Sequence, residues 1–227
     1  MSIKENYQKI REEIPDNVTI VLASKTRTPK EIEEVIEAGA TDIGQNYVQE
    51  AENMYNALSE KAGRVRWHMI GYLQKNKINK AIKIFDVLQT VDSLETAAAI
   101  DKRVETAGKK IIPVLIEINV GSEMTKAGIK PEYETVGNLV KEISKLEYLR
   151  LEGLMTMGPR FGNPEDSRKY FKKAKDIFEK IGIANFPGVN MKTLSMGMSN
   201  SYKAAIEEGS NMVRLGTVVF GERKYDK

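Results

Sequence analysis

Hydrophobic and polar positions repeat one unit along the chain: a short apolar run, then a longer segment with an apolar residue every three or four positions. Short apolar runs bounded by turn residues are typical of buried strands, and the longer spacing is typical of amphipathic helices. The pattern predicts eight strands, at Thr19–Lys25, Asp42–Asn46, Arg66–Gly71, Val87–Val91, Pro113–Val120, Arg150–Met157, Thr193–Met196 and Met212–Phe220.

The helical segments between these strands begin and end at recognisable signals. Pro29 stands in the first turn of one helix and Gly39 follows its end, while Ser93 is an expected N-cap of another. A further helix, Ser2–Ile14, precedes the first strand and is expected to cover one end of the fold. The helices predicted between strands are Pro29–Ala38, Val48–Ala62, Leu73–Ile84, Leu94–Ala107, Glu132–Leu146, Pro164–Ile181 and Tyr202–Glu208.

This alternation predicts one α/β domain spanning residues 1–227. Eight strand–helix units match the closed (β/α)8 barrel, the TIM barrel, here with an extra N-terminal helix. An open doubly wound sheet is the competing fold, but it usually has fewer strands and a glycine-rich first turn. The turn after the first predicted strand reads SKTRTP and contains no glycine.

Composition narrows the possible functions. The chain has 227 residues, no cysteine, one histidine and a net charge of +3, with charges of both signs interspersed. We therefore expect no disulfides, no histidine-rich zinc site and no nucleic-acid partner. The first residues lack the apolar segment of a signal peptide, and no apolar run reaches transmembrane length. The expected protein is cytoplasmic, without a membrane partner, and monomeric.

The single histidine, His68, lies inside the third predicted strand beside Trp67. Adjacent side chains of a strand point to opposite faces, so one of the two is expected to enter the barrel and the other to face the helices. A buried neutral histidine that neighbouring groups satisfy is favoured over a catalytic one.

Lys25 stands at the end of the first predicted strand. Barrel enzymes place their working residues at the C-terminal ends of strands. A lysine that loses its proton can form an imine with an aldehyde, whereas a lysine that reaches out to solvent needs no function. From this stretch alone both interpretations remain open.

Other strand ends also carry polar residues. Asn46 could hydrogen-bond a ligand or cap a turn. The loop from Asn119 to Gly128, which includes Glu123 and Lys126, could be a lid or an ordinary connection.

The last two strand ends suggest an anion site. Ser195, Gly197 and Ser199 precede a helix, whose start offers free N–H groups, although a serine cap would need no ligand. Arg214 lies among apolar residues and requires a partner. Phosphate sites of barrels are commonly built after strands seven and eight. Pyridoxal 5′-phosphate, with its aldehyde, phosphate and ring nitrogen, would satisfy the lysine, the anion site and the arginine, and sugar phosphates are the alternative.

The chain resembles the pyridoxal phosphate homeostasis protein family. The matching segments occur in the family's order over nearly the whole chain: ASKT, GQNYVQEA, WHMIGYLQKNK, VDS, INVGSEMTKAGI, EGLMTM, LSMGMS and VRLGTVVFGER. Gln45 is a departure, since the family usually has glutamate before the asparagine; the change is conservative and leaves the cofactor assignment standing.

The resemblance implies a barrel like the N-terminal domain of alanine racemase and an aldimine between Lys25 and the cofactor. It implies that Ser199, Gly216 and Thr217 bind the phosphate and that Arg214 faces the pyridine nitrogen. Asn46 is added to this set as a hydrogen-bonding residue. An arginine stays protonated, so the ring nitrogen does not keep its own proton and the ring is a weaker electron sink.

Two functions compete under this resemblance. A binding protein would hold pyridoxal phosphate and hand it to apoenzymes that depend on it. An amino-acid racemase would need a second acid–base group opposite the lysine. No segment after the eighth strand is expected to supply it, and Tyr47 and Tyr72 are the tyrosines near the correct end. We favour the binding protein. A sugar-phosphate enzyme would want carboxylates at the strand ends, and only Glu117 and Asp92 lie near any.

Overall fold

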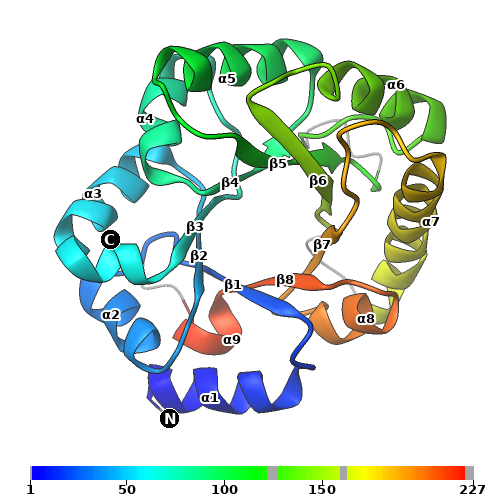
Figure 1. Cartoon of the computed structure of the whole chain (residues 1–227). Coiled ribbons are helices and arrows are strands. Elements are labelled where there is room, and N and C mark those ends of the chain that lie inside the picture. Colours follow the sequence, from blue (N-terminus) through cyan, green and yellow to red (C-terminus); the bar gives the residue numbers. More distant parts are fainter. Residues whose placement is uncertain (1, 122–126, 159–162, 223–227) are drawn as a thin grey trace.

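The computed structural model describes residues 2–121, 127–158 and 163–222, and within them eight parallel strands form a closed barrel in sequence order (Figure 1). The first strand pairs with both the second and the eighth, which closes the ring. The predicted fold class is therefore confirmed. The strands are β1 (Thr19–Ala23), β2 (Asp42–Gln45), β3 (Arg66–Met69), β4 (Val87–Val91), β5 (Ile112–Ile118), β6 (Leu149–Thr156), β7 (Thr193–Met198) and β8 (Met212–Leu215).

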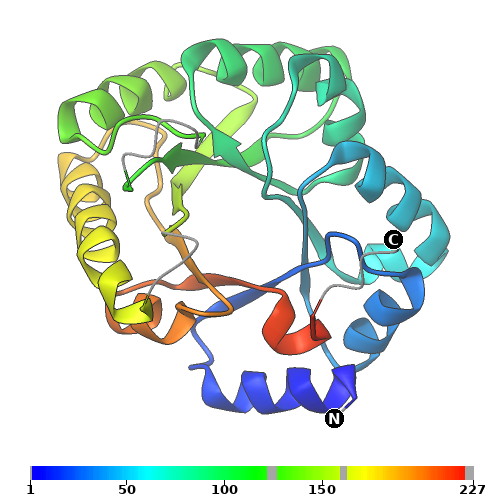
Figure 2. The same cartoon turned by 180° about the vertical axis from the view of Figure 1, so that it is seen from behind.

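Helices surround the barrel on its outer side, as both end-on views show (Figures 1 and 2). Ser93 caps its helix as expected, by accepting a hydrogen bond from the Thr96 N–H. In the described part of the chain, short 3₁₀ helices lie at Ser59–Arg64, Lys75–Lys77 and Pro164–Ser167. The α-helices are α1 (Ile3–Glu13), α2 (Pro29–Glu37), α3 (Val48–Leu58), α4 (Ile78–Ile84), α5 (Leu94–Thr106), α6 (Tyr133–Ile143), α7 (Arg168–Ala184), α8 (Tyr202–Glu207) and α9 (Thr217–Phe220).

Trp67 and His68 show how side chains alternate across the barrel wall. Trp67 faces the helices, where its Nε1 donates to the Ala62 carbonyl (2.9 Å) and its ring lies 5.5 Å from that of Tyr55. His68 enters the barrel and contacts Asp42 of β2. Both side chains are buried, and the polar groups of both have partners, as the sequence predicted for the histidine.

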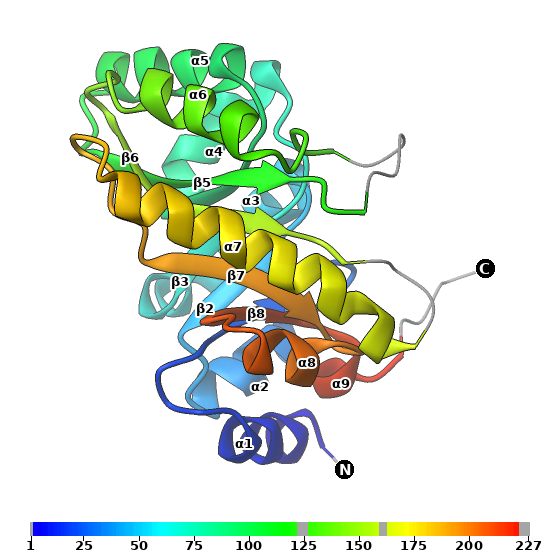
Figure 3. The same cartoon turned by 90° about the vertical axis from the view of Figure 1, so that its right-hand side faces the viewer.

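The N-terminal helix exists, but its predicted position is wrong. α1 does not cover an end of the barrel; it lies on the outer flank against α2 and α9 (Figures 1 and 3). The reason is the short last unit, because α9 has only four residues and cannot cover β8 and β1 alone. Tyr7 and Ile10 of α1 supply the missing apolar face, and the Asn6 side-chain amide donates to the Val219 carbonyl (3.0 Å).

The end of the last predicted strand is also wrong. β8 stops at Leu215, and residues predicted as strand, Thr217–Phe220, form α9. Their β-branched apolar sequence has strand character, but packing decides otherwise, since Val219 and Phe220 are buried beneath α1. The turn at Gly216 places the start of α9 next to the C-terminal end of β1, where a Cβ on Gly216 would lie 3.5 Å from the Ala23 carbonyl oxygen.

The C-terminal ends of the parallel strands open at one edge of the barrel, toward which the arrowheads of β5 and β7 point in the side view (Figure 3). Residues that follow β1, β2, β7 and β8 therefore meet at the same mouth. Within the described residues, no helix has both the length and the apolar composition needed to cross a membrane.

Candidate functional site

Lys25 lies at the barrel mouth, two residues beyond the end of β1. Ser24 holds this segment to β2, because its N–H and its hydroxyl both donate to the Gly44 carbonyl (2.9 and 3.0 Å). Lys25 itself is half-buried, and its Nζ donates to the Tyr47 hydroxyl (3.3 Å) and lies 4.7 Å from the centre of that ring. Within the described residues, no carboxylate forms an ion pair with it, which leaves the amine available to a ligand.

The backbone beside Lys25 is strained. Thr26 has φ of 64°, in the left-handed region that β-branched residues rarely adopt. A hydrogen bond from the Arg27 N–H to the Ser24 carbonyl (3.0 Å) closes the turn around Lys25 and Thr26. Such strain persists where the surrounding structure holds it in place, and here the hydrogen bonds of Ser24 and Arg27 hold the backbone on both sides of Lys25.

Arg214 is buried inside the barrel, with only 4% of its surface exposed. Its Nη1 donates to the Ser195 carbonyl (3.0 Å) and hydroxyl (2.7 Å), and its Nη2 donates to the Thr156 carbonyl (2.8 Å). Burial lowers the pKa of Arg214 to about 10, against the opposing effect of Glu117, so the group stays charged at neutral pH. Within the described residues, three of its five N–H donors are used in these bonds, which leaves two for a ligand.

Glu117 of β5 is a buried carboxyl close enough to Arg214 to interact electrostatically. Burial raises the pKa of Glu117 to about 7; the Arg214 guanidinium opposes this rise and Asp92 adds to it. Among the described residues, no hydrogen bond reaches its side chain, which explains why burial dominates.

Glu117→Gln should remove a pH dependence of stability. The folded protein keeps a proton on Glu117 up to pH about 7, whereas the unfolded chain loses it near 4.5. The unfolding free energy of the wild type should therefore fall as pH rises through that window, by up to about 3 kcal/mol.

Urea unfolding at several pH values should show the variant more stable than wild type above pH 7 and similar to it below pH 4. The exposed Glu134→Gln is the control; an unchanged slope in Glu117→Gln would contradict the assignment.

Ser199 connects the segments that follow β7 and β8. Its hydroxyl accepts hydrogen bonds from the backbone N–H groups of Gly216 (3.0 Å) and Val218 (3.4 Å). Its bonding partners thus lie at the start of α9, and neither it nor Ser201 makes the predicted side-chain cap of α8. Ser199, Gly216 and the exposed Thr217 are adjacent at the mouth, next to the β1 end that leads to Lys25.

Gly197 makes this arrangement possible. It has φ of 94°, and a Cβ there would lie 2.5 Å from the Cβ of Ala205 in α8. Only glycine allows both the turn at the end of β7 and the close approach of α8.

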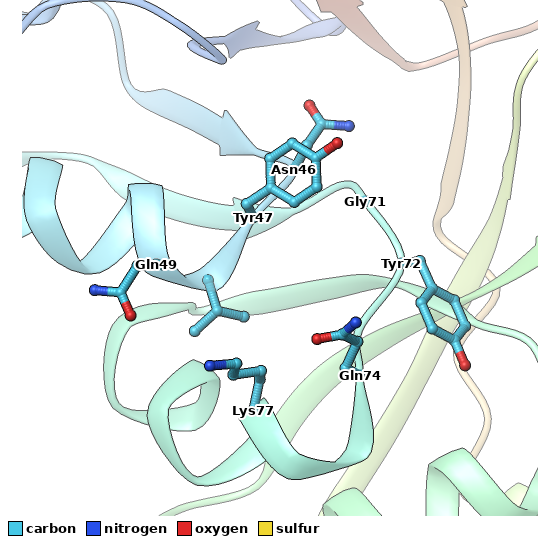
Figure 4. Close-up of a pocket in the computed structure, with 8 residues that line it drawn as sticks. Asn46, Tyr47, Gln49, Gly71, Tyr72, Gln74 and Lys77 are labelled. Carbon is cyan, nitrogen blue, oxygen red and sulfur yellow. The ribbon is translucent and has the colours of Figure 1, made fainter.

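Asn46 borders a cavity of about 340 Å³, but its side-chain amide points away from Gln74 and Lys77, which also line the cavity (Figure 4). Tyr47 and Tyr72 are exposed beside it. Gly71 is required here because a Cβ would lie 2.4 Å from the Asn46 carbonyl oxygen. Within the described residues, Lys25 contacts Tyr47, and no contact joins it to Asn46. The cavity is lined by Asn46, Tyr47, Val48, Gln49, Gly71, Tyr72, Gln74 and Lys77.

Gln45, the departure from the family pattern, points away from the mouth. It lines an outer cavity with Thr26 and Arg27, and its Nε2 reaches the Ser24 carbonyl (3.5 Å). The change therefore affects the packing between the barrel and its helices.

In the loop at Asn119–Gly128, Glu123 and Lys126 lie outside the described residues. Its ends are joined, since the Asn119 N–H donates to the Ile129 carbonyl (2.9 Å).

Gln89 is a buried residue that the sequence alone does not single out, although an amide within the apolar run VLQTV is a signal. It lies between His68 and Ser195 inside the barrel, and Ser195 in turn contacts Arg214. A buried amide must have its donors and its acceptor satisfied. The contacts of Gln89 therefore indicate whether His68 and Ser195 donate or accept a hydrogen bond.

Comparison with known proteins shows which family the chain belongs to. The sequence pattern of the alanine racemase N-terminal domain matches residues 1–224. Two similar relatives, each named pyridoxal phosphate homeostasis protein, come from Pasteurella multocida and Escherichia coli K12. The first is 35% identical, covering 100% of both chains, and the second is 33% identical, covering 99% of this chain and 98% of the relative.

Solved structures agree with this placement. PipY of Synechococcus elongatus PCC7942, determined with PLP bound, superposes with a TM-score of 0.88 at 28% identity, covering 97% of this chain and 100% of PipY. Alanine racemase of Clostridium difficile 630 shares the fold with a TM-score of 0.79 at 21% identity, but this chain covers 57% of it. The chain has the alanine racemase N-terminal-domain fold and belongs to the pyridoxal phosphate homeostasis protein family.

Proposed function

We propose that the protein binds pyridoxal 5′-phosphate at the barrel mouth, holds it as an imine on Lys25 and serves in the intracellular homeostasis of this cofactor. The observation that carries the proposal is the convergence of three different groups from neighbouring strands. An amine follows β1, a charged guanidinium stands in β8, and a serine after β7 contacts the start of α9.

Each group matches one part of the cofactor. Lys25 would hold the cofactor covalently, since an aldehyde condenses with an amine to an imine and releases water. Ser199, Gly216 and Thr217 would bind the phosphate at the place where barrels commonly do so. Arg214 would donate to the pyridine nitrogen, and Asn46 would contribute a hydrogen bond from the side of β2.

The openness of the mouth favours a carrier over an enzyme. Lys25 is only half-buried, and Tyr47, its hydrogen-bond partner, is 51% exposed. Closed sites that exclude water suit catalysis, whereas transfer to another protein requires that an incoming lysine reach the imine carbon. We propose that apoenzymes that use pyridoxal phosphate receive the cofactor. We also propose that this protein has one domain and acts in the cytoplasm as a monomer.

One contact favours racemisation as a second candidate function. The Tyr47 hydroxyl lies 3.3 Å from Lys25 Nζ, at the mouth where a racemase would need a second acid–base group. Incubating the loaded protein with L-alanine in D₂O and following the α-proton by NMR separates the two functions. The carrier retains the proton, and exchange that Tyr47→Phe abolishes would establish the racemase.

Ser199→Ala tests the phosphate half of the proposal. Loss of the hydroxyl removes one hydrogen-bond donor to the phosphate, so affinity for pyridoxal phosphate should fall roughly tenfold. Equilibrium dialysis measures this affinity directly. The control is Ser201→Ala, whose hydroxyl accepts from the Met198 N–H (3.3 Å) and does not reach α9. Equal affinities in the two variants would overturn the phosphate assignment.

A further inference from the structure

A chain of buried polar side chains crosses the barrel interior and ends on Arg214. Each of its five members is at most 4% exposed. His68 Nε2 lies 2.7 Å from Asp42 Oδ1, and Gln89 Nε2 lies 2.9 Å from His68 Nδ1. Ser195 Oγ lies 2.8 Å from Gln89 Oε1 and 2.7 Å from Arg214 Nη1. The chain thus runs through β2, β3, β4, β7 and β8.

The direction of every hydrogen bond follows from the Arg214 end. A guanidinium has donors and no acceptor, so the Ser195 oxygen accepts from it. The Ser195 hydroxyl has one proton, and within the described residues it donates that proton in a hydrogen bond to Gln89 Oε1. This choice turns the Gln89 amino group toward His68 Nδ1, with the Met212 sulfur as its second contact (3.3 Å). His68 Nδ1 is therefore an acceptor and carries no proton.

The contacts of Asp42, at the other end of the chain, independently require a proton on His68 Nε2. Its carboxylate also accepts from Arg66 (2.8 Å) and from the Thr41 hydroxyl (2.7 Å). With Arg66 and the Thr41 hydroxyl already donating to it, the ionised carboxylate is the acceptor in its contact with His68 as well. An ionised carboxylate needs a donor, which His68 Nε2–H provides. Both ends thus select one tautomer of the imidazole.

We propose that Gln89 and Ser195 are positioning residues for Arg214, and that they orient it through one directed hydrogen-bond chain anchored on a neutral, Nε2-protonated His68. The reverse orientation of the Gln89 amide would leave the buried Ser195 hydroxyl proton without an acceptor among the described residues. The chain fixes one Nη1 hydrogen, and the Ser195 and Thr156 carbonyls fix two more. The guanidinium keeps one orientation, with its remaining donors free for a ring nitrogen. Only this last point rests on the proposed function.

The single histidine makes the chain directly observable, because the imidazole nitrogen resonances of the protein all come from His68. Long-range ¹H–¹⁵N NMR of the cofactor-free protein at about pH 8, above the ordinary histidine pKa, reports which nitrogen is protonated. We expect the neutral Nε2–H form alone. In Ser195→Ala, Gln89 loses its anchor and its hydrogen bond to Nδ1 should weaken. Because Asp42 still holds the proton on Nε2, we expect the same tautomer with a displaced Nδ1 resonance.

Thr193→Val is the matched control. Thr193 lies two residues before Ser195 on the same strand, lines the cavity that His68 borders, and makes no side-chain hydrogen bond within the described residues. Its His68 spectrum should equal that of wild type. Ser195→Thr, which keeps a hydroxyl, should restore the wild-type spectrum. Gln89→Met is a second break in the chain if Ser195→Ala does not fold, and should likewise displace the Nδ1 resonance.

Adding pyridoxal phosphate tests the connection to the ligand. Binding should shift the His68 resonances in wild type and Thr193→Val, whereas in Ser195→Ala the shift should be lost and the affinity should fall about tenfold. A wild-type protein that binds no pyridoxal phosphate would overturn the proposed function, while the cofactor-free spectra still decide the chain. The chain is overturned if wild-type His68 is protonated at Nδ1, or if Ser195→Ala and wild type give the same spectrum.

Discussion

Lys25→Ala should eliminate every trace of covalently bound pyridoxal phosphate while leaving the cofactor able to bind weakly. The variant lacks the amine that forms the imine, but it keeps the Arg214 donors and the Ser199 contacts with the start of α9. Its structure should be unaffected, because the Lys25 side chain is half-buried and has one hydrogen bond, to an exposed tyrosine. The borohydride-stable adduct should vanish completely, and affinity by dialysis should fall by at least about tenfold.

Lys30→Ala is the control for this result. Lys30 lies five residues further on, is exposed in the first turn of α2, and forms no ion pair within the described part of the chain. It should load and reduce like wild type. Complete loss of cofactor binding in Lys25→Ala would count against the phosphate contacts, and an undiminished adduct would place the imine on another lysine.

Arg214→Ala should have the largest effect on the fold itself. The substitution leaves the Thr156 and Ser195 carbonyls and the Ser195 hydroxyl without their donor, and it empties the space that the side chain fills inside the barrel. Breaking a buried charged contact of this kind costs about 3–5 kcal/mol. Urea unfolding of the cofactor-free protein measures this loss.

Arg214→Gln separates the loss of charge from the loss of volume. It fills more of the space than alanine and keeps an N–H donor, so it should recover part of the unfolding free energy. It should still weaken binding of pyridoxal phosphate, because the charged fork that would face the ring nitrogen is gone. Wild-type affinity and a wild-type absorbance spectrum in Arg214→Gln would refute the role given to this residue.

The barrel could be predicted from sequence because each of its units repeats the same physical signal. Apolar strands such as Val87–Val91 and capped helices such as that starting after Ser93 identify themselves locally. Failures came where packing between distant segments overrides local preference. The run Thr217–Phe220 has strand character but forms α9. Because α9 is short and leaves apolar surface uncovered, α1 lies on the flank rather than at an end of the barrel.

The candidate site shows the same division. Lys25 and Ser199 could be identified from their places after strands, because parallel strands bring those places to one mouth, and Arg214 could be identified as a charged residue within an apolar strand. Their partners could not, since Tyr47 reaches Lys25, and Thr156 reaches Arg214, only through the closure of the barrel. The raised pKa of Glu117 depends on burial on all sides, which no local pattern reveals.

The central claim is that Lys25 carries pyridoxal phosphate as an imine, and one measurement tests it most directly. The purified protein is mixed with pyridoxal phosphate, its absorbance is recorded before and after borohydride reduction, and the labelled peptide is identified by mass spectrometry. We predict an imine band that borohydride removes and a reduced adduct on Lys25. A protein that stays colourless with pyridoxal phosphate and carries no adduct on Lys25 would contradict the account.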